Sequence, residues 1–377
     1  MTMSVGRPKR EMISREILKK IHETADRIGR LNIMEICGTH TNAIAKHGIP
    51  SLLPEGINLI SGPGCPVCVT SPEDIDTAIH LADRADVIFC TFGDMLKVPG
   101  TALNSLERLK AMGRDIRVIT TPLDCLKIAT GHPDKTILFL AVGFETTSPA
   151  VAYTIRTARE KGIANFRVFS AHKLIPPAMK VLLDDDDINL DAFLLPGHVC
   201  TILGKSDFEF LTDYGKVGVI TGFEAEDILA GIFMILRQIN ENRRSIEIEY
   251  RRVVREEGNA RARKILYEVF DVTDAAWRGL GEVRASGLKL REEFHGFDAA
   301  DAFDLPSIDA RKNEGCMCGD ILKGKKRPSD CRLFGQACTP FSPIGPCMVS
   351  HEGTCGAYYR HGRHLSGSVH TQKRDGK

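Results

Sequence analysis

Short apolar segments alternate with stretches of helical periodicity along most of this 377-residue chain, and no other feature constrains its fold as strongly. Strands that alternate with helices in this way form right-handed βαβ units around a mostly parallel sheet. The sequence therefore predicts an α/β fold. Strands are expected at 31–36, 57–60, 86–91, 116–121, 135–142, 166–170, 193–195 and 217–221, and helices at 11–30, 72–83, 102–112, 149–161 and 224–240.

Similar turns recur in the same order in two parts of the chain. CGTHT at 37–41 and GFETT at 143–147 both end a strand and open a helix, and the turn at 62–64 has a counterpart at 195–197. This order predicts two similar α/β domains with mostly parallel sheets that face each other across a cleft. Ligands in open α/β sheets bind at the carboxyl ends of the strands, where all of these turns occur.

The chain is accordingly expected to fall into four segments. The strand–helix alternation stops near residue 241, and the remainder is cysteine-rich. The expected segments are an N-terminal helix in 1–30, a first α/β domain in 31–134, a second α/β domain in 135–240 and a smaller, mainly helical or irregular domain in 241–377.

Six of the twelve cysteines fall in one C-terminal stretch: Cys316, Cys318, Cys331, Cys338, Cys347 and Cys355. Iron–sulfur clusters take four thiolates, usually all from cysteine. Structural zinc also takes four ligands, typically as two tight C-x-x-C pairs, and no such pair occurs in this stretch. The loose spacing, with Pro and Gly between the cysteines, favours a [4Fe–4S] cluster over zinc and leaves two cysteines spare.

Composition narrows the classes of partner. The formal net charge is +1, and the sequence has no stripe of basic residues that would indicate binding to nucleic acid. The longest apolar runs are too short to cross a bilayer, and no apolar segment follows the basic residues near the N-terminus, so neither a membrane span nor a signal peptide is predicted. A cytoplasmic location is expected, and clustered cysteines in a reducing compartment indicate metal or redox chemistry.

A C-x-x-C pair, Cys65 and Cys68, follows the glycine-rich turn after the strand at 57–60. Near a helix N-terminus, unpaired backbone N–H groups and the helix dipole favour a thiolate over a thiol. A thiol of low pKa with a neighbouring thiol suits reversible disulfide chemistry. Half of a zinc site, or simply two buried thiols, are the alternatives.

Three further turns carry candidate site residues. Cys37 and His40 could ligate iron together, or the imidazole could keep the thiol ionised; the alternative is a buried cysteine with a solvent-facing histidine. Glu145 follows a wholly apolar strand and is either a helix-cap partner or a proton carrier in the cleft. For His198 and His172, the sequence leaves open either a structural role or a place in the cleft.

Four sequence blocks together resemble the signature motifs of the HypD family of hydrogenase maturation factors: CGTHT at 37–41, GPGCPVC at 62–68, GFETT at 143–147 and PGHV at 196–199. The C-terminal cysteines are similar to that family's four-cysteine cluster pattern, at Cys316, Cys331, Cys338 and Cys355. The resemblance covers nearly the whole chain, and several blocks in the right order make it specific.

This resemblance implies two similar α/β domains, a smaller C-terminal iron–sulfur domain and a role in hydrogenase maturation. Such a protein would be a scaffold, with a HypC-like small chaperone, for assembly of the Fe(CN)2CO unit of [NiFe]-hydrogenases. Cyanide would come from a HypE-like donor, with a HypF-like carbamoyl transferase upstream.

The resemblance also implies roles for single residues. Cys37 would be the thiolate ligand of the nascent iron, with His40 beside it, and Cys65 and Cys68 would be the redox pair. Glu145 and His198 would line the cleft. The cluster ligands would be Cys316, Cys331, Cys338 and Cys355.

Two other functions use the same cysteines. The first is an iron–sulfur-dependent disulfide reductase, in which the cluster supplies electrons to Cys65 and Cys68 for work on another protein. The second is a zinc-stabilised binding protein without redox chemistry. Cys37 distinguishes the scaffold from the reductase, because a scaffold needs this thiolate and a reductase has no obvious use for it.

Overall fold

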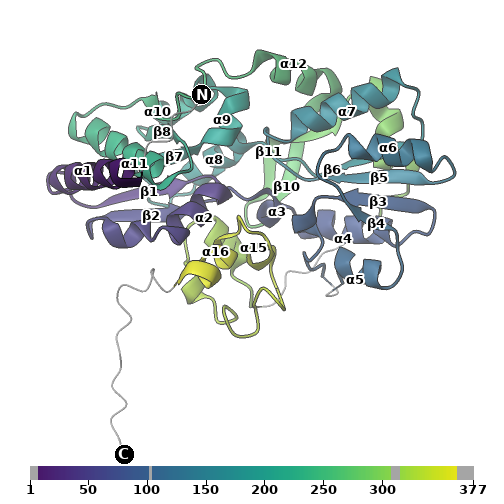
Figure 1. Cartoon of the computed structure of the whole chain (residues 1–377), viewed down its shortest axis with the longest axis horizontal. Coiled ribbons are helices and arrows are strands. Elements are labelled where there is room, and N and C mark those ends of the chain that lie inside the picture. The colour runs from purple at the N-terminus through teal and green to yellow at the C-terminus, as the bar shows by residue number, and fades with distance from the viewer. Residues whose placement is uncertain (1–6, 102–103, 307–314, 363–377) are drawn as a thin grey trace, which may run out of the picture.

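The computed structural model describes residues 7–101, 104–306 and 315–362, and it contains two parallel sheets (Figure 1). These sheets confirm the predicted α/β class. The five-stranded sheet has the order β2-β1-β7-β8-β9, with bounds Ile57–Ser61, Leu31–Glu35, Ala192–Pro196, Val217–Thr221 and Ile246–Ile248. The four-stranded sheet has the order β4-β3-β5-β6, with bounds Ile116–Val118, Val87–Thr91, Thr136–Ala141 and Phe166–Ser170.

The sheets do not follow the expected division into 31–134 and 135–240, because each of these segments contributes strands to both sheets. The chain builds β1 and β2, crosses to the second sheet for β3 to β6, and returns for β7 to β9. Strand β7, buried at all five positions, pairs with β1 on one side and β8 on the other. Apolar periodicity identified these strands, but it carries no information about which of them pair.

Helices cover the sheets and connect their strands. The predicted helices at 72–83, 149–161 and 224–240 are confirmed as α4, α7 and α11, whereas α6, α8 and α9 were not predicted. The helix expected at 102–112 is α5, and residues 102–103 lie outside the described part of the chain. The helices are α1 (Arg7–Ala25), α2 (Gly38–Lys46), α3 (Pro66–Val69), α4 (Pro72–Ala82), α5 (Leu106–Ala111), α6 (Asp124–Gly131), α7 (Ser148–Glu160), α8 (Ile175–Leu183), α9 (Gly197–Leu203), α10 (Phe210–Asp213), α11 (Ala225–Asn240), α12 (Ala260–Val269), α13 (Ala299–Ala302), α14 (Cys318–Leu322), α15 (Pro346–Val349) and α16 (Thr354–His361).

A long antiparallel hairpin lies within the segment after residue 240, which was expected to be mainly helical or irregular. Strands β10 (Phe270–Trp277) and β11 (Gly281–Leu290) lie between the two sheets (Figure 1). The buried Trp277 pairs with Thr70 and donates its indole N–H to Ser286 Oγ at 2.8 Å. Its ring stacks on Phe144 with 6.1 Å between ring centroids, so the hairpin joins α3 to the turn that follows β5.

The cysteine-rich C-terminal segment packs beneath the turns of the five-stranded sheet. Helix α16 contacts α2 and helix α15 contacts α3, as Figure 1 shows. A Cβ added to Gly38 would lie 2.3 Å from Glu352 Cβ, so this contact is close. Among the described helices, none is both long and apolar enough to cross a bilayer. Residues 1–6 and 363–377, at the outer ends of the expected first and last segments, lie outside the described residues.

Candidate redox and metal-binding site

Cys37 lies in the turn that joins β1 to α2, at the carboxyl end of the strand. Its thiol is buried, and burial raises its pKa to about 12. Its backbone N–H donates to Glu35 Oε2 at 2.9 Å. Because burial disfavours the thiolate, Cys37 carries its proton at neutral pH.

Gly64 brings the cysteine-pair loop directly against Cys37. A Cβ added to Gly64 would lie 2.1 Å from the backbone nitrogen of Cys37, which leaves no room for a side chain. The Gly38 N–H donates to the Gly64 carbonyl oxygen at 2.9 Å. The loop after β2 and the turn after β1 therefore form one unit, as expected for adjacent parallel strands.

Cys65 and Cys68 form a disulfide at the start of α3. Both residues are buried, and the backbone N–H of Cys68 also donates to Cys65 Sγ at 3.2 Å. The sequence left open whether these two cysteines are joined, and the structure pairs them. Their use in redox chemistry stays a prediction.

The histidines of CGTHT and PGHV both contact the ring of Phe223. The His40 ring centroid is 4.8 Å from that of Phe223, and the exposed His198 ring stacks at 3.9 Å. His40 Nε2 is 2.9 Å from the Gly222 carbonyl oxygen, and burial lowers the pKa of this histidine to about 4. Within the described residues, the other ring nitrogen of His40 has no hydrogen-bond partner. His40 is therefore a neutral imidazole beside the Cys37 turn.

Glu145 of GFETT is a buried carboxyl group whose pKa is raised to about 8 by burial. Its Oε1 accepts the Ile175 N–H at 2.9 Å, and its Oε2 has no partner among the described residues. Burial is the main cause of the raised pKa of the fully buried Cys200 thiol, and the Glu145 and Cys37 side chains, when ionised, raise it further. Cys200 therefore lies within electrostatic reach of both motifs.

All six C-terminal cysteines line one cavity, together with Ile321, Leu333, Phe334 and Met348. Cys318 Sγ is 2.9 Å from Cys347 Sγ. The backbone N–H of Ile344 donates to Cys338 Sγ at 3.4 Å. The segment thus folds into a thiol-lined, largely apolar cavity, and one of its sulfur atoms already accepts a backbone N–H.

The donor set of this cavity is six thiols, which is the kind of ligand that an iron–sulfur cluster takes. Tetrahedral zinc holds thiolates about 3.8 Å apart, as follows from Zn–S bonds of about 2.3 Å, whereas Cys318 Sγ and Cys347 Sγ are 2.9 Å apart. Within the described residues, no group of three or more His, Cys, Asp or Glu side chains is arranged to hold one metal ion.

Comparison with known proteins agrees with the motifs. A family model named HypD, described as "Hydrogenase formation hypA family", matches residues 12–362. The chain belongs to the HypD family. Hydrogenase maturation factor HypD2 of Bradyrhizobium diazoefficiens is 44% identical over 355 residues, which cover 92% of this chain and 93% of the relative. Hydrogenase maturation factor HypD of Cupriavidus necator is 45% identical over 342 residues, with 89% and 90% covered.

A third similar protein comes from another organism. A putative hydrogenase expression/formation protein of Methanocaldococcus jannaschii is 43% identical over 350 residues, which cover 93% of this chain and 97% of the relative. The resemblance stated from the sequence motifs is therefore confirmed at the level of the HypD family. The roles of single residues are not tested by these matches.

Glu35 is the site residue that the HypD motifs did not indicate. It is buried, burial raises its pKa to about 8, and it accepts hydrogen bonds from the Cys37 N–H and the Thr41 hydroxyl. The available signal was a carboxylate at the end of an apolar strand, two positions before Cys37. Glu352 is a second missed residue, since it accepts the Thr39 hydroxyl at 2.8 Å.

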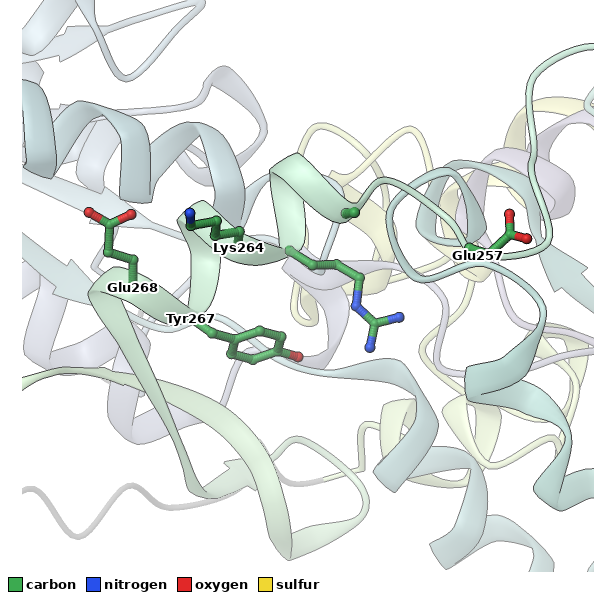
Figure 2. A pocket seen from close by; sticks show the side chains of 6 residues that line it. Glu257, Lys264, Tyr267 and Glu268 are labelled. Atoms are coloured by element: carbon green, nitrogen blue, oxygen red, sulfur yellow. The ribbon is translucent and has the colours of Figure 1, made fainter.

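A pocket of about 710 Å³ lies along α12, away from the cysteines (Figure 2). Its lining residues are Glu257, Ala260, Arg263, Lys264, Tyr267 and Glu268. Figure 2 shows the side chains of Glu257 and Glu268 at opposite ends of this surface. Arg263 is already paired with Asp207 at 2.7 Å. The pocket is a surface depression without thiol or imidazole, and it is not part of the candidate site.

Proposed function

We propose that this HypD-family chain is a scaffold on which the Fe(CN)2CO unit of [NiFe]-hydrogenases is assembled. The proposed partners are a HypC-like small chaperone and a HypE-like cyanide donor supplied by a HypF-like carbamoyl transferase, in the cytoplasm. The observation that carries the proposal is the contact at Gly64. It packs the backbone of Cys37 against the loop that carries the Cys65–Cys68 disulfide, and helix α15, which carries the cavity residue Cys347, contacts α3.

Cys37 is the proposed ligand of the incoming iron, which is cargo rather than a resident cofactor. Soft thiolate ligands suit low-spin iron that carries cyanide and carbon monoxide. Since burial raises the pKa of Cys37 to about 12, iron binding at neutral pH would release the thiol proton. His40, Glu145 and His198 are proposed to line the cleft around this iron.

Cys65 and Cys68 are the proposed redox pair. Reduction of their disulfide takes up two electrons and two protons and leaves two thiols. A [4Fe–4S] cluster, when held by Cys316, Cys331, Cys338 and Cys355, would supply single electrons. The 2.9 Å contact between Cys318 and Cys347 argues that these two cysteines are not both ligands, because thiolates on separate cluster corners lie farther apart.

Two features argue against the alternatives. Cys65 and Cys68 are 3% and 0% exposed, so a disulfide of another protein has no direct access to them, as a general reductase would require. The 2.9 Å separation of Cys318 Sγ and Cys347 Sγ is shorter than the roughly 3.8 Å between thiolates on one tetrahedral zinc ion, which disfavours a zinc site that uses both.

The test is a Cys37→Ala variant, produced together with the HypC-like, HypE-like and HypF-like partners and purified anaerobically. We expect the infrared bands of iron-bound cyanide and carbon monoxide to disappear, while the disulfide and any cluster absorption persist. Cys125→Ala is the matched control, because this cysteine is equally buried but belongs to the core of the other sheet. Bands of unchanged intensity in Cys37→Ala would contradict the scaffold role of this residue.

A further inference from the structure

We propose that the outer edge of strand β2 is a docking site, where an extended acidic segment of a partner protein adds to the five-stranded sheet as a further strand. Backbone groups of β2 would hold this segment, and basic residues beside the strand would select its charge. The inference goes beyond the proposed assembly function, because it uses none of the cysteines.

The edges of the two parallel sheets differ in their protection. Edge strands usually carry charges or are covered, because their unpaired backbone groups invite pairing with another chain. Strand β9 contains Glu247, and the three-residue β4 contains Arg117. Strand β6 contains Arg167 and is bridged to Asp298. Strand β2, which is the edge next to β1, has the five residues INLIS and no charged side chain (Figure 1). It is therefore the least protected of these four edges.

The hydrogen bonds around β2 show which of its backbone groups face outward. Gly62, which directly follows the strand, donates its N–H to the Glu35 carbonyl oxygen at 2.8 Å, so even-numbered residues face β1. Alternate residues of a parallel ladder bond to the same neighbour, so Leu59 and Ser61 direct their N–H and C=O groups away from β1. Ile57, in the same series, donates its N–H at 2.9 Å to a carbonyl outside the sheet. Within the described residues, no hydrogen bond outside the β1 ladder engages the backbone N–H of Leu59 or Ser61.

A pocket of about 320 Å³ lies along this outward edge. Its lining includes the four consecutive strand residues 58–61. Successive side chains of a strand point to opposite faces of the sheet, so a pocket that touches four residues in a row lies at the strand edge and not on one face. The segment 324–328 and Tyr358 contribute to the other wall. This volume lies at the lower end of the range of about 300–1,000 Å³ that ligand pockets have, which suits a short extended segment.

The other wall of the pocket is basic. Lys325 is already paired with two aspartates, at 2.9 Å and 3.1 Å. The exposed Lys326 has no ion-pair partner among the described residues, and Arg327 donates to the neutral side chain of Asn58 at 3.0 Å. Asp330 is the one carboxylate in the lining, and it accepts the backbone N–H of Arg327 at 2.8 Å. Two unpaired cations beside one carboxylate leave the lining positive, which favours an acidic segment over a basic one.

The two faces of the edge predict the pattern of the added segment. A Cβ added to Gly324 would lie 2.4 Å from Ile60 Cγ2, so the basic segment packs on the face of the sheet that carries Ile60. The half-buried Leu59 lies on the opposite face, against the apolar core of the five-stranded sheet. In strand addition, main-chain hydrogen bonds supply affinity and alternate side chains supply specificity. A segment in which acidic and apolar residues alternate therefore matches both faces.

The probe is a fluorescein-labelled peptide of alternating glutamate and valine, whose binding to the full anaerobic chain is measured by fluorescence anisotropy. One control peptide has lysine in place of glutamate. A second control peptide is acidic but carries N-methyl groups along its backbone, so it cannot donate hydrogen bonds to the strand edge. The first tests the charge of the segment, and the second tests backbone pairing.

Two variants of the chain test the same features from the other side. Lys326→Glu reverses the charge of the unpaired lysine. Leu59→Pro removes an outward N–H and leaves the bonds of the even-numbered residues to β1 in place, which is where an edge strand accepts proline. Lys110→Glu is the matched control, because this exposed lysine lies on α5, which packs against β4 of the other sheet.

We expect the acidic peptide to bind wild type, and both control peptides to bind about tenfold more weakly or less. Lys326→Glu should weaken binding of the acidic peptide about fivefold, because a repulsion replaces an attraction. Leu59→Pro should abolish binding, and Lys110→Glu should equal wild type. Absence of binding up to about 1 mM acidic peptide, or equal affinity for the acidic and lysine peptides, would overturn the proposal.

The test does not depend on one variant. If Leu59→Pro does not fold, the N-methylated peptide on the wild-type chain still decides whether backbone pairing holds the segment, and equal affinity for both acidic peptides would contradict strand addition. Sedimentation velocity of the peptide-free chain identifies the other possible occupant. A dimer that binds no acidic peptide would assign the edge to a second copy of this chain and overturn the acidic partner.

Discussion

The contact between Gly64 and Cys37 gives a prediction whose size follows from the structure. In Gly64→Ala the new Cβ would lie 2.1 Å from Cys37 N, 2.4 Å from Ile36 C and 2.5 Å from Cys37 Cα. All three are backbone atoms, so no side-chain rotation relieves the clash. Overpacking of this kind costs about 1–3 kcal/mol, and loss of the Gly38–Gly64 hydrogen bond adds about 1 kcal/mol. We expect the free energy of unfolding to fall by about 2–4 kcal/mol.

The assay is urea denaturation of the anaerobic protein, followed by circular dichroism. Gly131→Ala is the control, because an added Cβ there meets nothing within 4 Å. The variant should also expose the disulfide to dithiothreitol, which would reduce it faster than in wild type. A Gly64→Ala protein with wild-type stability and a wild-type rate of disulfide reduction would refute the close packing of these two turns.

Two further predictions concern Trp277 and Glu145. The chain has one tryptophan, Trp277, which pairs with Thr70, two residues after Cys68. Reduction of the disulfide by dithiothreitol should therefore raise tryptophan fluorescence in wild type and leave it unchanged in Cys68→Ala. Equal fluorescence changes in both proteins would contradict this prediction. For Glu145, the pKa is 4.5 in the reference state and about 8 in the fold, so the folded chain binds more protons between these values and the free energy of unfolding falls as pH rises through this window. Glu145→Gln has no carboxyl group to ionise, so its free energy of unfolding should not fall in this way. The difference in free energy of unfolding between the variant and wild type should grow by about 1 kcal/mol per pH unit between pH 4.5 and 8 in urea titrations. A difference that stays constant with pH would contradict a raised pKa of Glu145.

The elements of the fold were more predictable than their partners. The apolar segments that became β3, β5 and β8 are buried over their whole length or nearly so, and such segments are visible in the sequence. The pairing of β1 with β7 joins residues about 160 positions apart, as Ile33 with Ala192. No local pattern encodes such a partner. The order of similar turns suggested contiguous halves, but the chain crosses between the sheets.

The site was predictable where a motif carries its chemistry. The cysteine pair, the six-cysteine cavity and the approach of His40 to His198 all involve residues singled out by type and spacing. Glu35 could not be found in this way, because a single charged residue between apolar neighbours has no periodicity. Its importance comes from what lies against it after folding, which is the Cys37 turn.

We propose that the C-terminal cavity holds an iron–sulfur cluster and that the Cys65–Cys68 disulfide is reducible. The most direct test is the iron, zinc and acid-labile sulfide content, with the visible absorption spectrum, of anaerobically purified wild type beside Cys331→Ala. We expect about four irons and four sulfides per wild-type chain, with a broad visible absorption that the variant loses. Zinc without sulfide in the wild type, or an unchanged cluster in Cys331→Ala, would contradict it.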